Sequence, residues 1–272
     1  SPTNVKPYTK QAKNRNLLNQ KISILGCGWL GLALAIDLTN KGHEVYGSTT
    51  SESKLKRLEE NRIQPFLIDI SNPDVDMRDF LRSDVLIIAI TSKSIDAIKN
   101  LIKKIEESDI QKVLFISSTS VYPFTNGIVT EETATSNTPL AQIEQLFISN
   151  AAFQTTILRF GGLFGYDREP GKFFKPNKPV ENPDGYVNLI HRDDCINIIE
   201  QIILKNVWNE ILNACADDHP KRRDFYLKEI RKTGAPAIVF NETSESMYKI
   251  IDSQKIKNLL SYEFIHADLM NY

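Results

Sequence analysis

Three glycines near the start of the chain have the spacing of a phosphate-binding loop. The stretch "ISILGCGWLG" places Gly26, Gly28 and Gly31 in the pattern G-x-G-x-x-G, between an apolar run and a helix-like run. In such a loop the first glycine permits a tight turn, the second lets a pyrophosphate approach the backbone, and the third lets the helix pack closely on the strand. The loop therefore predicts a dinucleotide site, with Trp29 and Leu30 among its contacts. The alternative is a tight strand–helix turn with an empty site.

Hydroxyl groups stand where the second strand of such a site ends. An NAD site usually carries Asp or Glu at this place, where the carboxylate grips the ribose hydroxyls. This chain has Thr49, Thr50 and Ser51 instead, and no carboxylate there repels a 2′-phosphate. Lys54 or Arg57 would supply positive charge, although an ordinary solvated helix face explains each of them equally well. We therefore favour NADP over NAD as the cofactor and leave both open.

The secondary structure that positions the glycine loop and the hydroxyl groups is predicted by apolar runs that alternate with helical patterns. Most strand candidates are near-continuous in Ile, Val, Leu and Phe, as strands covered on both faces of a parallel sheet require. The pattern predicts a Rossmann-type, doubly wound α/β fold with a small C-terminal substrate lobe. The predicted strands are 22–25, 44–47, 65–68, 85–90, 113–117, 155–160, 210–213 and 237–240. The predicted helices are 30–40, 53–60, 95–105, 140–150, one that starts at about 191, 223–232 and 253–260.

The composition and pattern of the sequence suggest three parts. Residues 1–20 form a polar extension, 21–165 the dinucleotide-binding core, and 166–272 a substrate-binding lobe interleaved with the core. Cys27 and the other two cysteines show no metal-ligand spacing, so we predict neither a disulfide scaffold nor a metal site.

The balance of charge excludes some classes of partner. The 272 residues include 33 Lys and Arg against 34 Asp and Glu. A general nucleic-acid or anionic-membrane binder needs a positive field, so we expect neither partner. No apolar run approaches the ~20 residues that span a bilayer, and residues 1–20 contain no apolar signal core. We therefore expect a cytoplasmic protein with a small-molecule substrate.

A family resemblance appears at "VLFISSTSVYP", residues 113–123. This stretch resembles the fifth-strand motif of the extended short-chain dehydrogenase/reductase family, which includes NAD-dependent epimerases and dehydratases. "TEET", "ILRFGGLFG" and "NLIHRDDC" resemble further family motifs in the same order, and the matches span about residues 22–200. The resemblance implies an NAD(P)-binding, epimerase/dehydratase-like oxidoreductase of an atypical kind. It also implies cofactor contacts at Asp69, Ile90 and Ser117.

The catalytic residues of the family are only partly matched. Its chemistry rests on a Ser or Thr and a Y-x-x-x-K pair, in which the Tyr moves a proton while the nicotinamide moves a hydride. Ser118 matches the Ser, but the following helix region, "TATSNTPLAQIEQLFISN", contains neither Tyr nor Lys. Anchoring on Glu144 puts Ser136 at the tyrosine position and Leu140 at the lysine position. The resemblance therefore implies the fold and the cofactor site without the standard mechanism.

Other side chains are candidates for the missing proton transfer. Tyr122 follows the fifth strand and is the first candidate, although family members usually use this Tyr for packing or substrate contact. Tyr166 is a second. His191 titrates near neutral pH, and its alternative role is a helix-start hydrogen bond with Asp193 or Asp194.

The resemblance and the residue types also suggest substrate contacts. Arg159 and Arg168 would hold an anionic group through paired hydrogen bonds, with a buried structural bond as the alternative for Arg159. Asn188 and His191 belong to the motif that resembles N-x-I-H-x-x-D. The resemblance implies that both lie on the substrate side.

The sequence is compatible with two classes of function. The first is an atypical oxidoreductase or epimerase that acts on a small polar substrate such as a nucleotide sugar, favoured by Ser118, Asn188 and His191. The second is a non-catalytic NAD(P)-binding sensor or regulatory protein, favoured by the missing Tyr and Lys. Relatives often form dimers through four helices. Apolar residues on the predicted helices 95–105 and 140–150 suggest a homodimer, with a monomer as the alternative.

Overall fold

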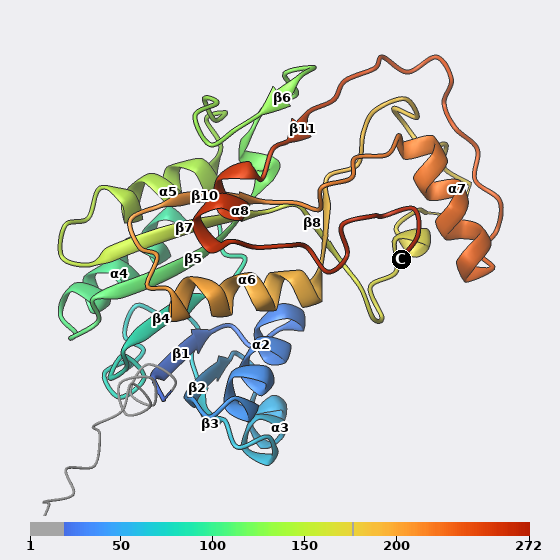
Figure 1. The fold of residues 1–272 in the computed structure, drawn as a ribbon. Helices are drawn as coiled ribbons and strands as arrows, with labels where there is room; N and C mark the ends of the chain where they lie inside the picture. The colour runs from blue at the N-terminus through green and yellow to red at the C-terminus, as the bar shows by residue number, and fades with distance from the viewer. Residues whose placement is uncertain (1–18, 176) are drawn as a thin grey trace, which may run out of the picture. The chain divides into compact units, whose positions relative to one another are not determined.

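The architecture is a parallel sheet with helices packed on it. A computed structural model describes residues 19–175 and 177–272, and its ribbon is drawn in Figure 1. Seven strands form one sheet in the order β10-β7-β5-β4-β1-β2-β3. The ladders β1–β2, β1–β4, β2–β3 and β7–β10 are all parallel. The strands are β1 (Lys21–Leu25), β2 (Glu44–Thr49), β3 (Gln64–Leu67), β4 (Val85–Ile88), β5 (Lys112–Ser118), β7 (Gln154–Phe160) and β10 (Ile211–Ala214). The predicted Rossmann-type α/β class is confirmed.

The chain divides into two compact units. The first unit runs to Leu114 and includes Ala152–Gln154, and the second contains Phe115–Ala151 and Thr155–Tyr272. This division falls within β5. The predicted boundary at residue 165 separates a cofactor-binding core from a substrate-binding lobe by function, and it stays a prediction. The predicted polar extension lies outside the described residues, apart from its last two positions.

The first unit is a β–α–β series built on buried aliphatic strands. Its helical elements are α2 (Trp29–Asn40), η1 (Glu52–Lys54), α3 (Leu55–Glu60) and α4 (Ile95–Glu106). Helix α2 turns Leu34 and Leu38 into the core, where both are fully buried. The chain leaves this helix through Gly42, whose φ of +96° is a conformation that favours glycine.

Helix α4 directs its apolar face inward. Ser94 caps its N-terminus by accepting a hydrogen bond from the Ala97 amide at 3.2 Å. Ile98, Leu101 and Ile105 are buried, so these side chains are not exposed for a contact with a second copy. The apolar face of α4 therefore gives no support to a dimer, and the homodimer stays a prediction.

The second unit adds two small sheets to its share of the central one. Strand β6 (Ile128–Val129) pairs in parallel with β11 (Ile250–Ile251), and β8 (Gly162–Phe164) pairs in parallel with β9 (Leu189–His191). Its helical elements are η2 (Thr119–Val121), α5 (Pro139–Ile148), η3 (Pro170–Lys172), α6 (Arg192–Leu204), α7 (Arg222–Thr233) and α8 (Gln254–Leu260). The predicted helices are confirmed to within a few residues.

The predicted strand at 237–240 is wrong. Only one isolated bridge forms there, between Val180 and Phe240, and Val239 is 69% exposed. An apolar run becomes a strand only when a partner offers several backbone groups to pair with. Among the described residues, no helix has the length and apolar character needed to cross a membrane.

Candidate functional site

The glycine loop between β1 and α2 has the geometry that its spacing predicts. Gly26 has a φ of +99°, and a Cβ on it would lie 2.8 Å from the side chain of Ile90. A Cβ on Gly31 would lie 2.0 Å from the carbonyl oxygen of Gly26. Around Gly28, by contrast, an added Cβ would meet no atom within 4 Å. The outer two glycines are therefore needed for packing, while the middle one keeps the backbone open to a ligand.

The start of helix α2 is suited to an anion. Gly28 is the N-cap and offers no side chain to the amides of the first turn, which carries no acidic residue. Backbone amides and the helix dipole together place a partial positive charge at this end. The loop therefore combines an open approach with a group that attracts phosphate.

The end of β2 presents hydroxyl groups beside this loop. The Gly26 amide donates to the Ser48 hydroxyl at 2.8 Å, which fixes the loop to the strand. Thr49 is buried, and its hydroxyl accepts from the Ser51 amide at 3.2 Å. Thr50 is exposed. Short side chains with hydroxyl groups thus occupy the position at which an NAD site usually carries a carboxylate.

Charged residues flank this edge of the first unit. Lys54 and Arg57 are both exposed. Asp69 is also exposed, and its carboxylate accepts from the amide and the hydroxyl of Ser71 at 2.9 and 2.7 Å. These bonds hold the pKa of Asp69 below its ordinary value. The adenine-side residue implied by the resemblance is therefore an ionised, surface carboxylate.

Cys27 in the middle of the loop has a packing role. Its thiol is buried, and its sulfur would lie 2.8 Å from a Cβ on Gly47. Burial raises the pKa of the thiol to about 12. A thiol that stays protonated is a poor nucleophile, so Cys27 fills the turn without redox chemistry.

Ser118 caps a short turn in the second unit. It is half-buried, and its hydroxyl accepts from the Ser120 amide at 3.1 Å, at the start of η2. At the other end of the same turn, the Lys249 ammonium donates to the carbonyls of Thr119 and Tyr122 at 2.9 and 2.8 Å. Burial lowers the pKa of Lys249. The turn that carries Ser118 is therefore held at both ends.

A buried network lies below this turn. Arg159 of β7 binds Glu144 of α5 through Nε and Nη2, with a shortest N–O distance of 2.5 Å. The Ser117 hydroxyl donates to the same carboxylate at 2.5 Å. Arg159 Nη1 donates to the Tyr122 hydroxyl at 2.7 Å, and that hydroxyl donates to Asn213 at 2.7 Å. Each polar group in this network has a partner, as burial demands.

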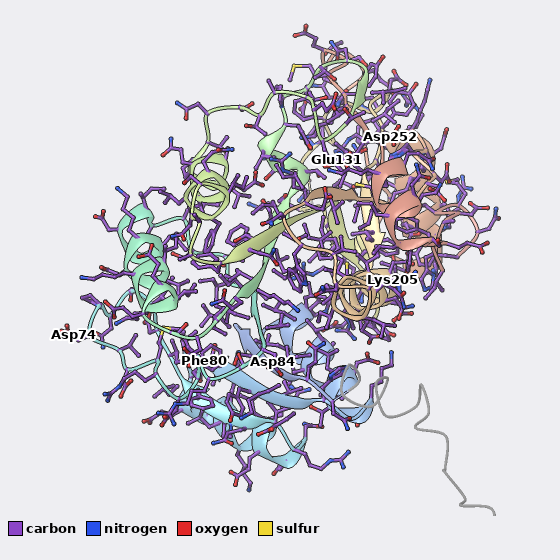
Figure 2. All side chains as sticks on the ribbon, turned by 60° about the vertical axis from the view of Figure 1, so that its left-hand side comes forward. Asp74, Phe80, Asp84, Glu131, Lys205 and Asp252 are labelled. Atoms are coloured by element: carbon purple, nitrogen blue, oxygen red, sulfur yellow. The ribbon has the colours of Figure 1, made fainter. Side chains whose placement is uncertain are left out.

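Asn213 links this network to two acidic residues. Its amide donates to the Glu131 carboxylate at 3.2 Å, and its side chain donates to the Asp252 carbonyl at 3.3 Å. Figure 2 labels both Glu131 and Asp252. Burial raises the pKa of Glu131. The network therefore reaches from α5 through three strands of the sheet to the segment before α8.

Two predicted site residues belong to this network. Tyr122 is 2% exposed, with its hydroxyl bound to Arg159 and Asn213, and burial raises its pKa. Its role as a proton donor stays a prediction. Arg159 is 3% exposed and pairs with Glu144. This is the buried bond given above as the alternative for Arg159, and its contact with a substrate anion stays a prediction.

Helix α5 lacks the reactive groups that the resemblance would place on it. Ser136 precedes the helix, and its backbone amide donates to the Val121 carbonyl at 2.8 Å. Leu140 lies in the first turn and is partly buried against Val121, Val129 and their neighbours. Neither residue offers an acid, a base or an ammonium group.

Comparison with known proteins identifies the family. The profile described as NAD(P)H-binding matches residues 26–201, more than half of the chain. The chain belongs to the NAD(P)H-binding family. Protein YeeZ of Escherichia coli strain K12 is 30% identical over 267 residues, which cover 92% of this chain and 97% of YeeZ.

Solved structures of similar fold extend over most of this NAD(P)H-binding chain. A conserved protein from Silicibacter pomeroyi has a TM-score of 0.78 at 17% identity, covering 93% of this chain and 96% of its own. The UDP-glucuronic acid 4-epimerase of Bacillus cereus, solved in complex with NAD, has a TM-score of 0.74 at 21% identity, covering 92% and 93%. At these identities the likeness shows the fold alone.

Asn188 serves a structural role in this member of the NAD(P)H-binding family. Its side chain donates to the carbonyl of Lys249 at 2.8 Å and accepts from the amide of Ile251 at 2.9 Å. We call residues 247–252 the strap. Three other asparagines bind its backbone: Asn182 at Met247, Asn126 at Tyr248 and Asn213 at Asp252. Both ends of the Asn188 carboxamide thus bind the strap, and its role as a substrate contact stays a prediction.

Arg168 borders an open cavity in the second unit. The cavity has a volume of about 510 Å³ and is lined by Leu163, Asp167, Arg168, Glu169, Lys172 and Phe173. Arg168 is exposed. Binding of a substrate anion by Arg168 therefore stays a prediction.

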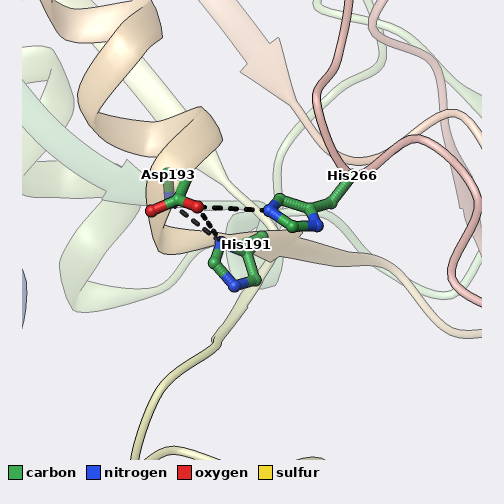
Figure 3. A group of neighbouring side chains, drawn as sticks. All are labelled: His191, Asp193 and His266. Carbon is green, nitrogen blue, oxygen red and sulfur yellow. Dashed lines mark hydrogen bonds and ion pairs between the residues drawn. The ribbon is translucent and has the colours of Figure 1, made fainter. Parts of the chain in front are cut away.

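His191 lies in a cluster that the sequence does not reveal. Its Nδ1 accepts from the Asp193 amide at 3.0 Å and so caps helix α6, which confirms the predicted helix-start bond. Figure 3 shows Asp193 and His266 beside it. His266 lies in the segment after α8, and its ring stacks on that of His191 at 3.8 Å. Burial, and then His266, lower the pKa of His191.

Proposed function

We propose that this chain binds a nicotinamide dinucleotide at the 26–31 loop and uses it as an atypical oxidoreductase or epimerase. The observation that carries the proposal is the pair of packed glycines, Gly26 and Gly31, around an open Gly28 at an uncapped helix start. This is the arrangement that a pyrophosphate requires. Family membership supports the same ligand.

NADP is the favoured form of the cofactor. Thr49, Thr50 and Ser51 carry no negative charge that would repel a 2′-phosphate, and Lys54 lies exposed three residues beyond Ser51. The similar epimerase of Bacillus cereus was solved with NAD, so NAD remains the competing cofactor and the titration below includes both.

The substrate that we propose is a small polar molecule such as a nucleotide sugar, taken by the second unit in the cytoplasm. Ser118 is half-buried at the start of its turn, and Arg168 borders the 510 Å³ cavity. The Bacillus cereus protein of similar fold is a UDP-glucuronic acid epimerase, which supports this substrate class. Ser118 retains a hydroxyl proton to donate while its oxygen accepts from Ser120.

A second candidate function is a non-catalytic NAD(P)-binding sensor. The buried hydroxyl of Tyr122 and the absence of Tyr and Lys from α5 favour it. Both candidates need the cofactor, and they differ only in turnover.

The test begins with calorimetric titration of the protein with NADPH, NADP⁺, NADH and NAD⁺. Gly28→Val places a side chain where the pyrophosphate would lie, and we expect at least tenfold weaker binding. Gly127→Val is the matched control, because an added Cβ at Gly127 also meets no atom within 4 Å. Equal binding by wild type and Gly28→Val would overturn the proposed site.

Turnover is then assayed with a panel of UDP-sugars. Cofactor absorbance reports net hydride transfer, and chromatographic separation of sugar epimers reports a reaction that returns the hydride. Conversion of any UDP-sugar in the panel supports the proposal that the protein is an enzyme. Cofactor binding without conversion across the panel favours the sensor.

A further inference from the structure

Three potential metal ligands meet at the start of helix α6. His191 Nδ1 lies 3.5 Å from Asp193 Oδ2, and His266 Nε2 lies 3.2 Å from the same oxygen. All three atoms lie within 4.8 Å of one another. Figure 3 shows the three side chains together. We propose that His191, Asp193 and His266 form a binding site for one divalent transition-metal ion of the Zn²⁺ class. This site departs from the expectation of no metal.

The distances suit such an ion. Zn²⁺ bonds to imidazole nitrogen and carboxylate oxygen at about 2.0–2.2 Å, so ligand atoms around a tetrahedral ion lie roughly 3.4 Å apart. The two measured nitrogen–oxygen separations, from Asp193 to His191 and to His266, lie on either side of this value. Two imidazoles and one carboxylate also suit zinc, cobalt or nickel better than the oxygen-seeking Mg²⁺ or Ca²⁺.

The backbone places His266 without help from an ion. Asp194 is fully buried, and its carboxylate accepts from the Ile265 amide at 2.7 Å and from the His266 amide at 3.0 Å. The Tyr262 hydroxyl donates to it at 2.5 Å. The segment that carries His266 is therefore tied to the same turn of α6 that carries Asp193.

His191 is placed by a second backbone constraint. Gly165 has a φ of +116°, and a Cβ on it would lie 2.5 Å from His191 Nε2. The ring therefore occupies its position only because residue 165 has no side chain. With Nε2 against the backbone, Nδ1 is the nitrogen that faces Asp193.

The carboxylate of Asp193 is prepared to bind through one oxygen. Its Oδ1 accepts from the Tyr166 hydroxyl at 2.5 Å, while Oδ2 faces the two histidines. A hydrogen bond to the second oxygen of a ligating carboxylate is the usual support for a metal ligand. Three protein ligands leave one tetrahedral position for water or another molecule, as in zinc sites that do chemistry.

Metal binding requires two local changes. His191 Nδ1 must give up its bond to the Asp193 amide, because the same lone pair would bind the ion. The rings of His191 and His266 stack with an interplanar angle of 27°. The lone pair of an imidazole nitrogen lies in the plane of its ring, so one ring must tilt until its lone pair points at the ion. Both changes are rotations of side chains.

The test uses the full chain without added histidines, freed of metal by chelator. Calorimetric titration with ZnCl₂ should show one ion per chain, and titration with CoCl₂ should give the visible absorption of a four-coordinate Co²⁺ complex. His266→Ala should weaken Zn²⁺ binding at least tenfold and abolish the cobalt band. Asp193→Asn should do the same.

The chain supplies matched controls, because it has four histidines and two lie elsewhere. His43→Ala and His219→Ala should leave both signals unchanged, and circular dichroism confirms that each variant is folded. Absence of stoichiometric binding by the wild type, or equal binding by His266→Ala, would overturn the proposal. NADPH titration of His266→Ala is run in parallel, so that a loss of metal binding and a loss of cofactor binding are distinguished.

Discussion

Gly31 packs against the carbonyl oxygen of Gly26 so closely that a Cβ on Gly31 would lie 2.0 Å from that oxygen. This contact joins the first turn of α2 to the end of β1. Gly28, two residues away from Gly26, has no comparable neighbour. The glycines of one motif therefore have separable roles, one in folding and one in ligand approach.

Substitution separates these two roles. Gly31→Ala should lower the free energy of unfolding by about 3 kcal/mol, because the backbone must move to admit the methyl group. Gly28→Ala should leave the free energy of unfolding within about 1 kcal/mol of wild type and weaken NADPH binding. Urea denaturation and fluorescence titration measure the two effects. A Gly31→Ala variant with wild-type stability would contradict the close contact.

Loss of Glu144 should be costly. Glu144→Ala leaves the Arg159 guanidinium buried without its anion, and removal of one partner from such a pair costs about 3–5 kcal/mol. Glu242→Ala is the control: Glu242 pairs with Arg223 at 2.6 Å but is 62% exposed, so about 0–1 kcal/mol is expected. Urea denaturation of the two variants measures the difference. Similar losses would show that the pair is not buried in solution.

Tyr122→Phe tests whether this hydroxyl has a structural or a chemical role. It leaves Arg159 Nη1 and Asn213 Oδ1 without their shared partner, so the free energy of unfolding should fall by about 1–3 kcal/mol. Tyr248→Phe is the control, since Tyr248 is half-buried and contacts Tyr186 through its ring. Thermal unfolding monitors both. A fully stable Tyr122→Phe protein that has lost turnover would support Tyr122 as the proton donor.

A carboxylate at the end of β2 should change cofactor preference. Ser51→Glu places negative charge where we expect the 2′-phosphate, so the Kd for NADPH should rise at least tenfold while that for NADH stays equal or falls. Gln64 is exposed at the start of β3, and Gln64→Glu adds the same negative charge there, so this variant controls for a general change of charge. An unchanged NADPH affinity in Ser51→Glu would show that the phosphate does not lie there.

Acid should destabilise the first unit through His43. Its Nδ1 accepts from the Gln20 amide at 3.2 Å, and burial lowers its pKa. The unfolded chain therefore binds a proton at a higher pH than the folded one, so stability is present above the ordinary histidine pKa and falls as the pH drops below it. Urea midpoints between pH 7.5 and about pH 5 measure the slope, which should be shallower in His43→Gln. The same pH dependence in wild type and His43→Gln would show that His43 does not cause the loss of stability in acid.

The sequence was most informative where a pattern is local. The strand at Lys21–Leu25 and the helix at Ile95–Glu106 follow from runs and periods of neighbouring residues. The false strand at 237–240 has the same apolar character but only one backbone bridge. The pairs β6–β11 and β8–β9 are two or three residues long, too short for a period to emerge.

Side-chain partnerships across the chain were the least predictable. The glycine loop is contained in six consecutive residues, so spacing alone finds it. Glu144 meets Arg159 only after α5 packs on β7, and Asp193 meets His266 across 73 positions. The sequence shows that Tyr122 and Arg159 are present, but it does not show that Tyr122 binds Asn213 or that Arg159 pairs with Glu144.

The way in which the strap is held affects which substitutions the protein tolerates during evolution. A carboxamide carries the same donor and acceptor as a peptide group, so the four asparagines that hold residues 247–252 act as a substitute neighbouring strand. They recognise main chain, whatever side chains it bears. Drift should therefore be free at Met247, which is 42% exposed, and resisted at Asn188. The position of the strap is encoded in residues distant from it in the sequence.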